Sequence, residues 1–351
     1  MPLTAPFPWY GAKRRWAESV WERFGNDLGA YVEPFAGSLA VLLHRPTPVP
    51  REVVCDTDGA LCNFWRAIRA APDEVAYWCD YPTIHQDLTA RHRWLIQWAK
   101  EHAEQLSEDP EYYDARAAGW WVWGISLWIG TGWCLPTSAN NTAKPRTKDT
   151  GGGQGVARRP YGTMPVVQTW PGARGVSAQG NVREQMPRTG DQYSGSHVTA
   201  QRVSTKTRPD LIEWFGLIAA RLKGTIVLNR GWESAVTPTV LMQTASGPKP
   251  PVGILMDPPY LTDERSKHLY SSDILGESNR VARESYEWAI AHGRCYRIAY
   301  CCHAGDFEVP DGWTFETQTF GGIKNAERFA NRRDMIMFSP ACIPGRQARL
   351  W

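Results

Sequence analysis

The fold is decided by the segment Val252-Gly253-Ile254-Leu255-Met256-Asp257-Pro258-Pro259-Tyr260. Its apolar first half is typical of a strand buried in a parallel sheet. Neither proline can donate a ladder hydrogen bond, so we expect the strand to end at Asp257. In open α/β sheets, ligands bind beyond the carboxyl ends of the strands. This segment therefore offers an acceptor, a proline-stiffened carbonyl and an aromatic ring where they could hold a planar amine, such as the amino group of a base.

The same residues also fit a simpler interpretation. Asp257 could cap a proline-rich turn and Tyr260 could pack against the core, and a four-residue match alone does not separate the two interpretations. The rest of the chain has to decide between them.

Length and composition limit the class of protein. A chain of 351 residues allows about two domains, or one domain with a large insertion. No apolar run approaches the ~18 residues of a membrane span, and Met1–Trp9 lacks the features of a signal peptide. The eight cysteines are scattered, which favours reduced thiols and a cytoplasmic location. Cys295, Cys301, Cys302 and His303 match no zinc spacing, so we expect core packing there and no metal.

The net charge of +3 is unevenly distributed. Residues 135–208 hold 11 Lys and Arg against 3 Asp and Glu, so this segment carries +8 and the remainder carries −5. The segment has no apolar periodicity, and its composition predicts loops that bury little surface without a partner. A basic insert on a mildly acidic body is typical of nucleic-acid binding, although a solvated loop has the same composition. Its candidate DNA contacts are Arg158, Arg159, Arg174, Arg183 and Arg188.

Two strands with chemistry at their ends are expected early in the chain. The first runs from Tyr31 through Glu33-Pro34-Phe35-Ala36-Gly37 into a turn that lets a ligand approach the backbone. The second, Glu52 to Asp56, ends in an acid that could accept ribose hydroxyls. The glycine pattern is not that of a dinucleotide site, which argues against NAD. Asp56 could instead cap the following helix, an alternative that fits Asp58 better.

The remaining elements follow from periodicity and from helix-end signals. Residues 72–110 are expected to be helical, and most tryptophans of the segment from Tyr112 to Trp133 are expected in the core. One or two near Gly130-Thr131-Gly132-Trp133 could instead line a nucleic-acid cleft. The other predicted helices cover 14–24, 59–69, 210–222 and 280–292, and the other predicted strands cover 225–228, 296–301, 313–320 and 335–338, the last two as a hairpin.

These motifs together resemble the Dam-type DNA N6-adenine methyltransferases. Pro8-Trp9-Tyr10-Gly11-Ala12-Lys13, Glu33–Gly37, Asp56 and Asp257–Tyr260 are similar to that family's motifs and occur in its order. The resemblance covers roughly residues 6–134 and 209–340.

The resemblance implies an α/β fold, with a seven-stranded, mostly parallel, Rossmann-like sheet and helices on both faces. It implies a catalytic domain formed by 1–110 and 209–351, with a target-recognition insert at 111–208. The cofactor would be S-adenosylmethionine, leaving S-adenosylhomocysteine, without a metal. Its contacts would come from Tyr10, Lys13, Glu33, Pro34, Phe35, Ala36, Gly37, Asp56 and Asp257.

The substrate implied is an adenine flipped out of double-stranded DNA. Asp257 and the Pro258 carbonyl would accept its N6 amine, Pro259 would stiffen the turn, and Tyr260 would stack on the base. Two departures stand out: Leu39 replaces a second glycine of the first motif, and Gly231 stands where an acid is common, with Asn229, Trp232 and Glu233 as possible substitutes.

Other functions remain open from the sequence. N4-cytosine methylation uses the same amine chemistry, a silent DNA-binding protein could retain the fold, and RNA or protein-glutamine methylation uses related motifs. The oligomeric state, the recognition sequence and any accompanying restriction endonuclease are not readable, and a solitary phage or prophage enzyme is one possibility.

Overall fold

The computed structural model describes residues 2–9, 13–109, 111–128, 133–134, 203, 206–242, 250–261, 278–318 and 333–345. Tyr10 and the five candidate DNA-binding arginines between 158 and 188 lie outside these ranges. Within them, no helix is long and apolar enough to cross a membrane.

Seven strands of the described chain form one sheet. They are β1 (Ala30–Glu33), β2 (Arg51–Cys55), β3 (Thr225–Leu228), β4 (Val252–Met256), β5 (Arg297–His303), β6 (Thr314–Gln318) and β7 (Asp334–Phe338). Their order across the sheet is β3-β2-β1-β4-β5-β7-β6. The predicted strand segments all appear, with boundaries within about two residues.

All pairs in the sheet are parallel except those of β7, which runs antiparallel to both β5 and β6. Parallel neighbours need a crossover connection, and helices supply most of them here. This arrangement confirms the predicted α/β fold with a mostly parallel seven-stranded sheet, and it confirms the closing hairpin.

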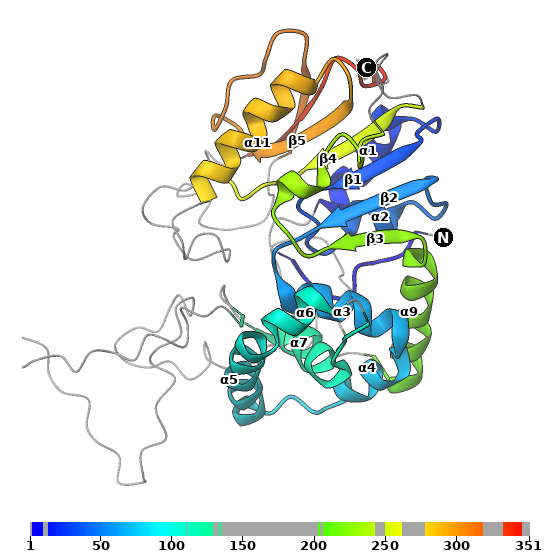
Figure 1. Ribbon diagram of the computed structural model, residues 1–351, viewed down its shortest axis with the longest axis vertical. Helices are drawn as coiled ribbons and strands as arrows, with labels where there is room; N and C mark the ends of the chain where they lie inside the picture. The colour runs from blue at the N-terminus through cyan, green and yellow to red at the C-terminus, as the bar shows by residue number, and fades with distance from the viewer. Residues whose placement is uncertain are drawn as a thin grey trace, which may run out of the picture.

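The helices group around the sheet as Figure 1 shows, with α3 to α7 and α9 gathered beyond β3 and α11 beside β5. Their bounds are η1 (Arg14–Trp16), α1 (Ala17–Phe24), α2 (Ala40–His44), α3 (Gly59–Ala70), α4 (Pro72–Cys79), α5 (His85–Glu101), α6 (Ala103–Glu108), α7 (Ala115–Leu127), α9 (Arg208–Leu222), η4 (Trp232–Ala235) and α11 (Ser278–His292). The predicted helices 14–24, 59–69, 210–222 and 280–292 agree with η1 and α1, α3, α9 and α11 within two residues, whereas the predicted helical span 72–110 is divided into α4, α5 and α6.

Both faces of the sheet are covered by apolar side chains, because alternate residues of each strand point to opposite faces. Tyr31, Val54 and Leu255 belong to the cluster that includes α1, α2, α3 and α7. Val32 and Ile254 belong to a second cluster that includes η4 and α11. Burial on both faces is what makes the strands read as continuous apolar runs.

The tryptophan-rich helix α7 packs against α3, α4 and α5. Trp121, Trp123 and Trp133 are buried, as predicted, whereas Trp120 and Trp128 are only partly covered. The sequence assigned α7 to the recognition insert, and here it is part of the helical group of the core. The division of the chain into a catalytic domain and an insert remains a prediction.

Helix α9, where the chain returns from residues 135–205, is fixed at both ends. Thr207 and Asp210 form a reciprocal capping box at its start, where Arg208 also pairs with Asp80 at the end of α4. Near its other end, the guanidinium of Arg221 donates two hydrogen bonds of 2.7 and 2.8 Å to the carboxylate of Glu52 on β2. Both side chains of that pair are buried, so α9 is tied firmly to the sheet.

Candidate functional site

Lys13 and the residues that follow β4 form a buried ion pair. Lys13 Nζ lies 2.9 Å from Asp257 Oδ1 and stands over the ring of Tyr260, 4.9 Å from its centroid. Only 3% of the Lys13 side chain and 21% of the Asp257 side chain are exposed. Pro258, Pro259 and Tyr260 are buried. The strand thus ends at Asp257 as predicted, with the carboxylate, the proline carbonyl and the aromatic ring close together.

Burial and charge oppose each other in this pair. Removal from water raises the pKa of Asp257, whereas the Lys13 ammonium and the Tyr260 hydroxyl stabilise its carboxylate. For Lys13, burial alone would lower the pKa, but the charges of Asp257 and Asp334 among others raise it above its ordinary value. Lys13 therefore stays an ammonium ion and holds Asp257 as its counterion.

A histidine and a second acid lie beside this pair. The ring of His303 packs edge-on against Tyr260, with 4.5 Å between the centroids. His303 ends β5 and is the cross-strand partner of Asp334, which begins β7. Asp334 is only 8% exposed, and its carboxylate has no hydrogen bond or ion pair among the described residues. The sequence places His303 only in a cluster expected to pack in the core, and it does not single out Asp334, because only the antiparallel course of β7 brings Asp334 to this edge.

The turn after β1 lies at the same edge, since β1 is hydrogen-bonded to both β2 and β4. Gly37 has a φ of 47°, and a Cβ placed there would come within 2.6 Å of the indole ring of Trp9. Only glycine fits such a contact. Trp9 itself packs on Phe7 and Trp121. The N-terminal motif therefore covers the turn through Trp9, a residue that sequence reasoning did not single out.

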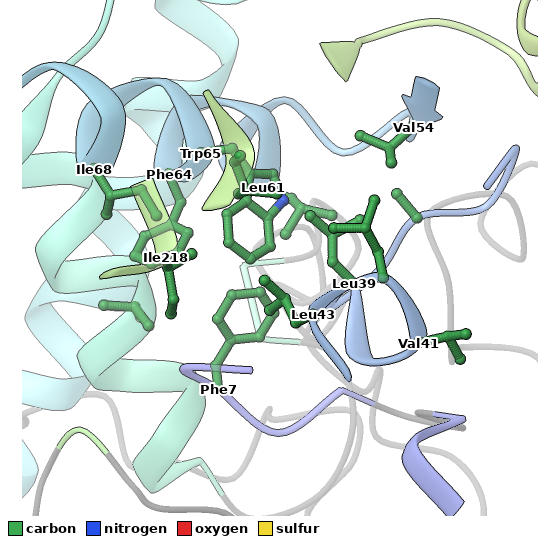
Figure 2. Close-up of a cluster of buried hydrophobic side chains, with 14 of the residues drawn as sticks. Phe7, Leu39, Val41, Leu43, Val54, Leu61, Phe64, Trp65, Ile68 and Ile218 are labelled. Carbon is green, nitrogen blue, oxygen red and sulfur yellow. The ribbon is translucent and has the colours of Figure 1, made fainter. Parts of the chain in front are cut away.

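Leu39 occupies the position where a second glycine was expected, and its backbone behaves as that glycine would. Its φ of 56° and ψ of 29° lie in the left-handed region. The side chain is fully buried, and Figure 2 shows it among Leu43, Val54 and Leu61. The leucine thus keeps the glycine-type turn and fills the core beneath it.

Glu33, predicted to contact the cofactor, directs its carboxylate into the protein. Its Oε1 accepts hydrogen bonds from the Tyr31 hydroxyl at 2.7 Å and from the backbone N–H of Leu42 at 3.0 Å. Leu42 is in the first turn of α2, so Glu33 caps that short helix from the side. Burial raises the pKa of Glu33 to about 8, against the effect of these two donors. Its role towards a cofactor stays a prediction.

Asp56, directly after β2, links the two early motifs. Its Oδ2 accepts the N–H of Gly37 and its Oδ1 accepts the N–H of Asp58, both at 2.9 Å. Burial, with the neighbouring charge of Asp58, raises the pKa of Asp56 to about 6. Asp58, and not Asp56, is the N-cap of α3, where its side chain accepts from Ala60 and Leu61. Asp56 is therefore left partly buried at the edge of the sheet, and each carboxylate oxygen still has a lone pair to accept another hydrogen bond.

Residues 9–147 match the family model described as D12 class N6 adenine-specific DNA methyltransferase. Over these residues the chain is similar to this class of methyltransferase. The match confirms the family predicted from the sequence and the adenine-specific activity on DNA, and it includes Trp9, Lys13, the turn after β1 and Asp56. A comparison with curated protein sequences found no match.

The methyltransferase also departs from the expected pattern after β3. Trp232 is buried and stacks on Phe35, with ring centroids 6.1 Å apart and planes inclined by 23°. At Gly231, a Cβ would come within 2.6 Å of Glu233 Oε2. The carboxylate of Glu233 thus reaches back to the space that a side chain at 231 would occupy. Asn229 instead donates to the backbone carbonyl of Asp56 and supports β2.

The remaining predicted residues of the methyltransferase have simpler positions. Pro34, Ala36 and Gly37 are buried in the turn, and Phe35 is partly exposed there. Cys301 and Cys302 are buried within β5 as expected, whereas the expected core position of Cys295 is wrong, because it lies exposed in the turn before β5. Among the described residues, no group of three or more His, Cys, Asp or Glu side chains is arranged to hold a metal ion.

Proposed function

We propose that this methyltransferase transfers a methyl group from S-adenosylmethionine to the N6 amine of an adenine flipped out of double-stranded DNA, at a specific sequence. The observation that carries the proposal is the meeting of two motifs at one edge of the sheet. Asp56 and the Gly37 turn supply groups suited to a nucleoside, and Asp257 to Tyr260 supply groups suited to a planar amine beside them.

The residues at the ends of β1, β2 and β3 fit an adenosyl cofactor. The partly buried carboxylate of Asp56 has lone pairs left for the two hydroxyls of a ribose. Phe35 offers a partly exposed ring for stacking on an adenine, and Glu233 offers a carboxylate for its amine. S-adenosylmethionine, when bound, supplies a methyl group on a positively charged sulfur that is ready for transfer.

The residues after β4 would act on the target base. A base inside a duplex cannot reach the largely buried carboxylate of Asp257, so it has to be flipped out. Asp257 and the Pro258 carbonyl would accept hydrogen bonds from N6 and increase electron density on that nitrogen. Tyr260 would hold the ring by stacking. Positioning and fixed electrostatics are sufficient, because the leaving group is already activated.

The basic segment 135–208 would supply most of the DNA contacts. Its net charge of +8 suits the phosphate backbone, and its arginines suit both phosphates and base edges. The candidates are Arg158, Arg159, Arg174, Arg183 and Arg188. Deleting residues 140–200 is expected to remove DNA affinity together with its salt dependence and to spare cofactor binding. Salt-sensitive DNA binding by the deletion variant would refute this assignment.

Nucleoside mass spectrometry tests the proposed reaction directly. Unmethylated genomic DNA incubated with the protein and S-adenosylmethionine should acquire N6-methyladenine, and mapping would then give the recognition sequence. N4-methylcytosine would retain the mechanism and overturn the choice of base. No modified nucleoside, with folded protein and several DNAs, would favour a DNA-binding protein that lacks activity.

A pair of substitutions separates catalysis from binding. Asp257→Ala is expected to abolish transfer and to leave DNA affinity within a few-fold of the wild type. Asp311→Ala, in an exposed turn before β6, is the matched control and should change neither property. Equal loss of transfer and DNA affinity in Asp257→Ala would count against its assigned role.

A further inference from the structure

The ammonium of Lys13 lies where the proposed reaction needs the N6 amine of the base. It is within hydrogen-bond distance of Asp257, at 2.9 Å, and it stands over the ring of Tyr260. A flipped adenine would use the same carboxylate for its amine and the same ring for stacking. Since this inference concerns that base, it rests on the proposed function.

Lys13 cannot stay in this position during methyl transfer. A cation bound to Asp257 neutralises the carboxylate, whose negative charge is needed to accept a hydrogen bond from N6. It would also repel the positively charged sulfur of the methyl donor across the pocket. The side chain of lysine is long and has rotatable bonds along its stem, so its ammonium can move while its backbone stays in place.

A buried ammonium that moves needs another anionic partner nearby, because an unpaired charge in a protein interior is unstable. Asp334 is such an anion. It begins β7 opposite His303, whose ring is in contact with Tyr260, and it is more than nine-tenths buried. Its carboxylate has no hydrogen bond or ion pair among the described residues. Lys13 is the charge that most favours its ionised form, ahead of His303 and Arg15.

We propose that Asp334 is the alternate ion-pair partner of Lys13, which receives the ammonium when the target adenine takes its place on Asp257. Lys13 then has two positions. In the first it neutralises Asp257 and fills the amine site, and in the second it pairs with Asp334 and opens that site. Asp334 is a positioning residue, which acts on base capture through Lys13.

The test measures binding of the amine without turnover. The recognition sequence is first mapped with the wild type as described above. Duplexes with adenine or with purine, which lacks the amine, at the target position are then titrated at pH 8 with S-adenosylhomocysteine present. The ratio of the two affinities reports what the amine contributes. The test variants are Asp334→Asn, Lys13→Met and the double variant. The matched control is Asp306→Asn, which alters the acid beside His303.

Asp334→Asn is expected to lower the adenine preference at least about fivefold, because the displaced ammonium loses its partner. Lys13→Met should raise the preference, and in that background Asp334→Asn should change it less than about twofold, since uncoupled sites behave independently. Asp334→Glu should restore the wild-type ratio, and Asp306→Asn should leave it unchanged.

Several results would overturn the proposal. An equal effect of Asp334→Asn with and without Lys13 would show that Asp334 acts independently. A lowered adenine preference in Lys13→Met would show that Lys13 supports the base and does not compete with it, and this arm needs no variant of Asp334. Failure of the wild type to form N6-methyladenine would refute the proposed function itself and the inference with it, so the two failures are distinguishable.

Discussion

Replacing Leu39 by glycine and, separately, by alanine tests the unusual backbone of the turn before α2. Leu39 combines a left-handed conformation with a fully buried side chain. Both substitutions remove the same packing, because neither residue reaches into the cluster shown in Figure 2. They differ in backbone strain, because only glycine adopts the left-handed region without steric cost.

The magnitudes decide the order of stability. Loss of the buried leucine side chain is expected to destabilise both variants by about 2–5 kcal/mol. Alanine retains a left-handed strain of about 1–2 kcal/mol, which glycine removes. Glycine instead loses about 0.5–1 kcal/mol more backbone entropy on folding. Leu39→Gly should therefore be more stable than Leu39→Ala by about 1 kcal/mol, although both are much less stable than the wild type.

Urea unfolding followed by tryptophan fluorescence provides the comparison, since the chain has 18 tryptophans. Val41, buried in α2 with ordinary helical geometry, is the matched control. There the order should be reversed, with Val41→Gly less stable than Val41→Ala by about 1 kcal/mol. The same order at both positions, with alanine the more stable, would refute the left-handed assignment of Leu39.

Three further predictions concern carboxylates near the site. Burial raises the pKa of Asp56 to about 6. The affinity for S-adenosylmethionine, measured by calorimetry, should therefore be constant above pH 7 and fall about tenfold per pH unit below 6. Asp56→Asn should remove this pH dependence. Burial raises the pKa of Glu33 to about 8, so the folded protein keeps this carboxyl protonated between its ordinary pKa and pH 8. The contribution of Glu33 to stability is therefore present at low pH and is lost as the pH rises through 8. The melting temperature of Glu33→Gln, measured relative to the wild type, should increase from pH 5 to pH 8.5. Glu233→Gln should weaken S-adenosylmethionine binding about tenfold in the same calorimetric assay, whereas Glu213→Gln, exposed on α9, should not.

The sequence was sufficient to predict the fold because its strongest signals are local. Two prolines follow Asp257 and end β4, a capping residue begins α3, and Pro209 marks the first turn of α9, which begins two residues before its predicted start. Asp58 was favoured over Asp56 as the helix cap for the same reason, and it is the cap. Such features depend on residues a few positions apart, so a single sequence contains them.

The missing parts of the site depend on contacts between distant segments. Asp334 comes near Lys13 only because β7 runs antiparallel to β5, a pairing that no short motif encodes. Trp9 covers Gly37 through a packing contact, and Glu33 turns inward to Tyr31 and Leu42. The residues expected to contact DNA lie outside the described ranges, so their roles remain predictions.

The two anchored ends of helix α9 have a consequence for how the chain can diverge. The chain leaves the helical group after α7 and returns to it at α9, which is held by Asp80 at one end and by Glu52 at the other. Neither anchor belongs to the edge of the sheet that holds Asp56 and Asp257. A segment of another length or sequence grafted between α7 and α9 would therefore rejoin the core at a fixed point, so the residues between the two helices could change during evolution while Asp56 and Asp257 stayed in place.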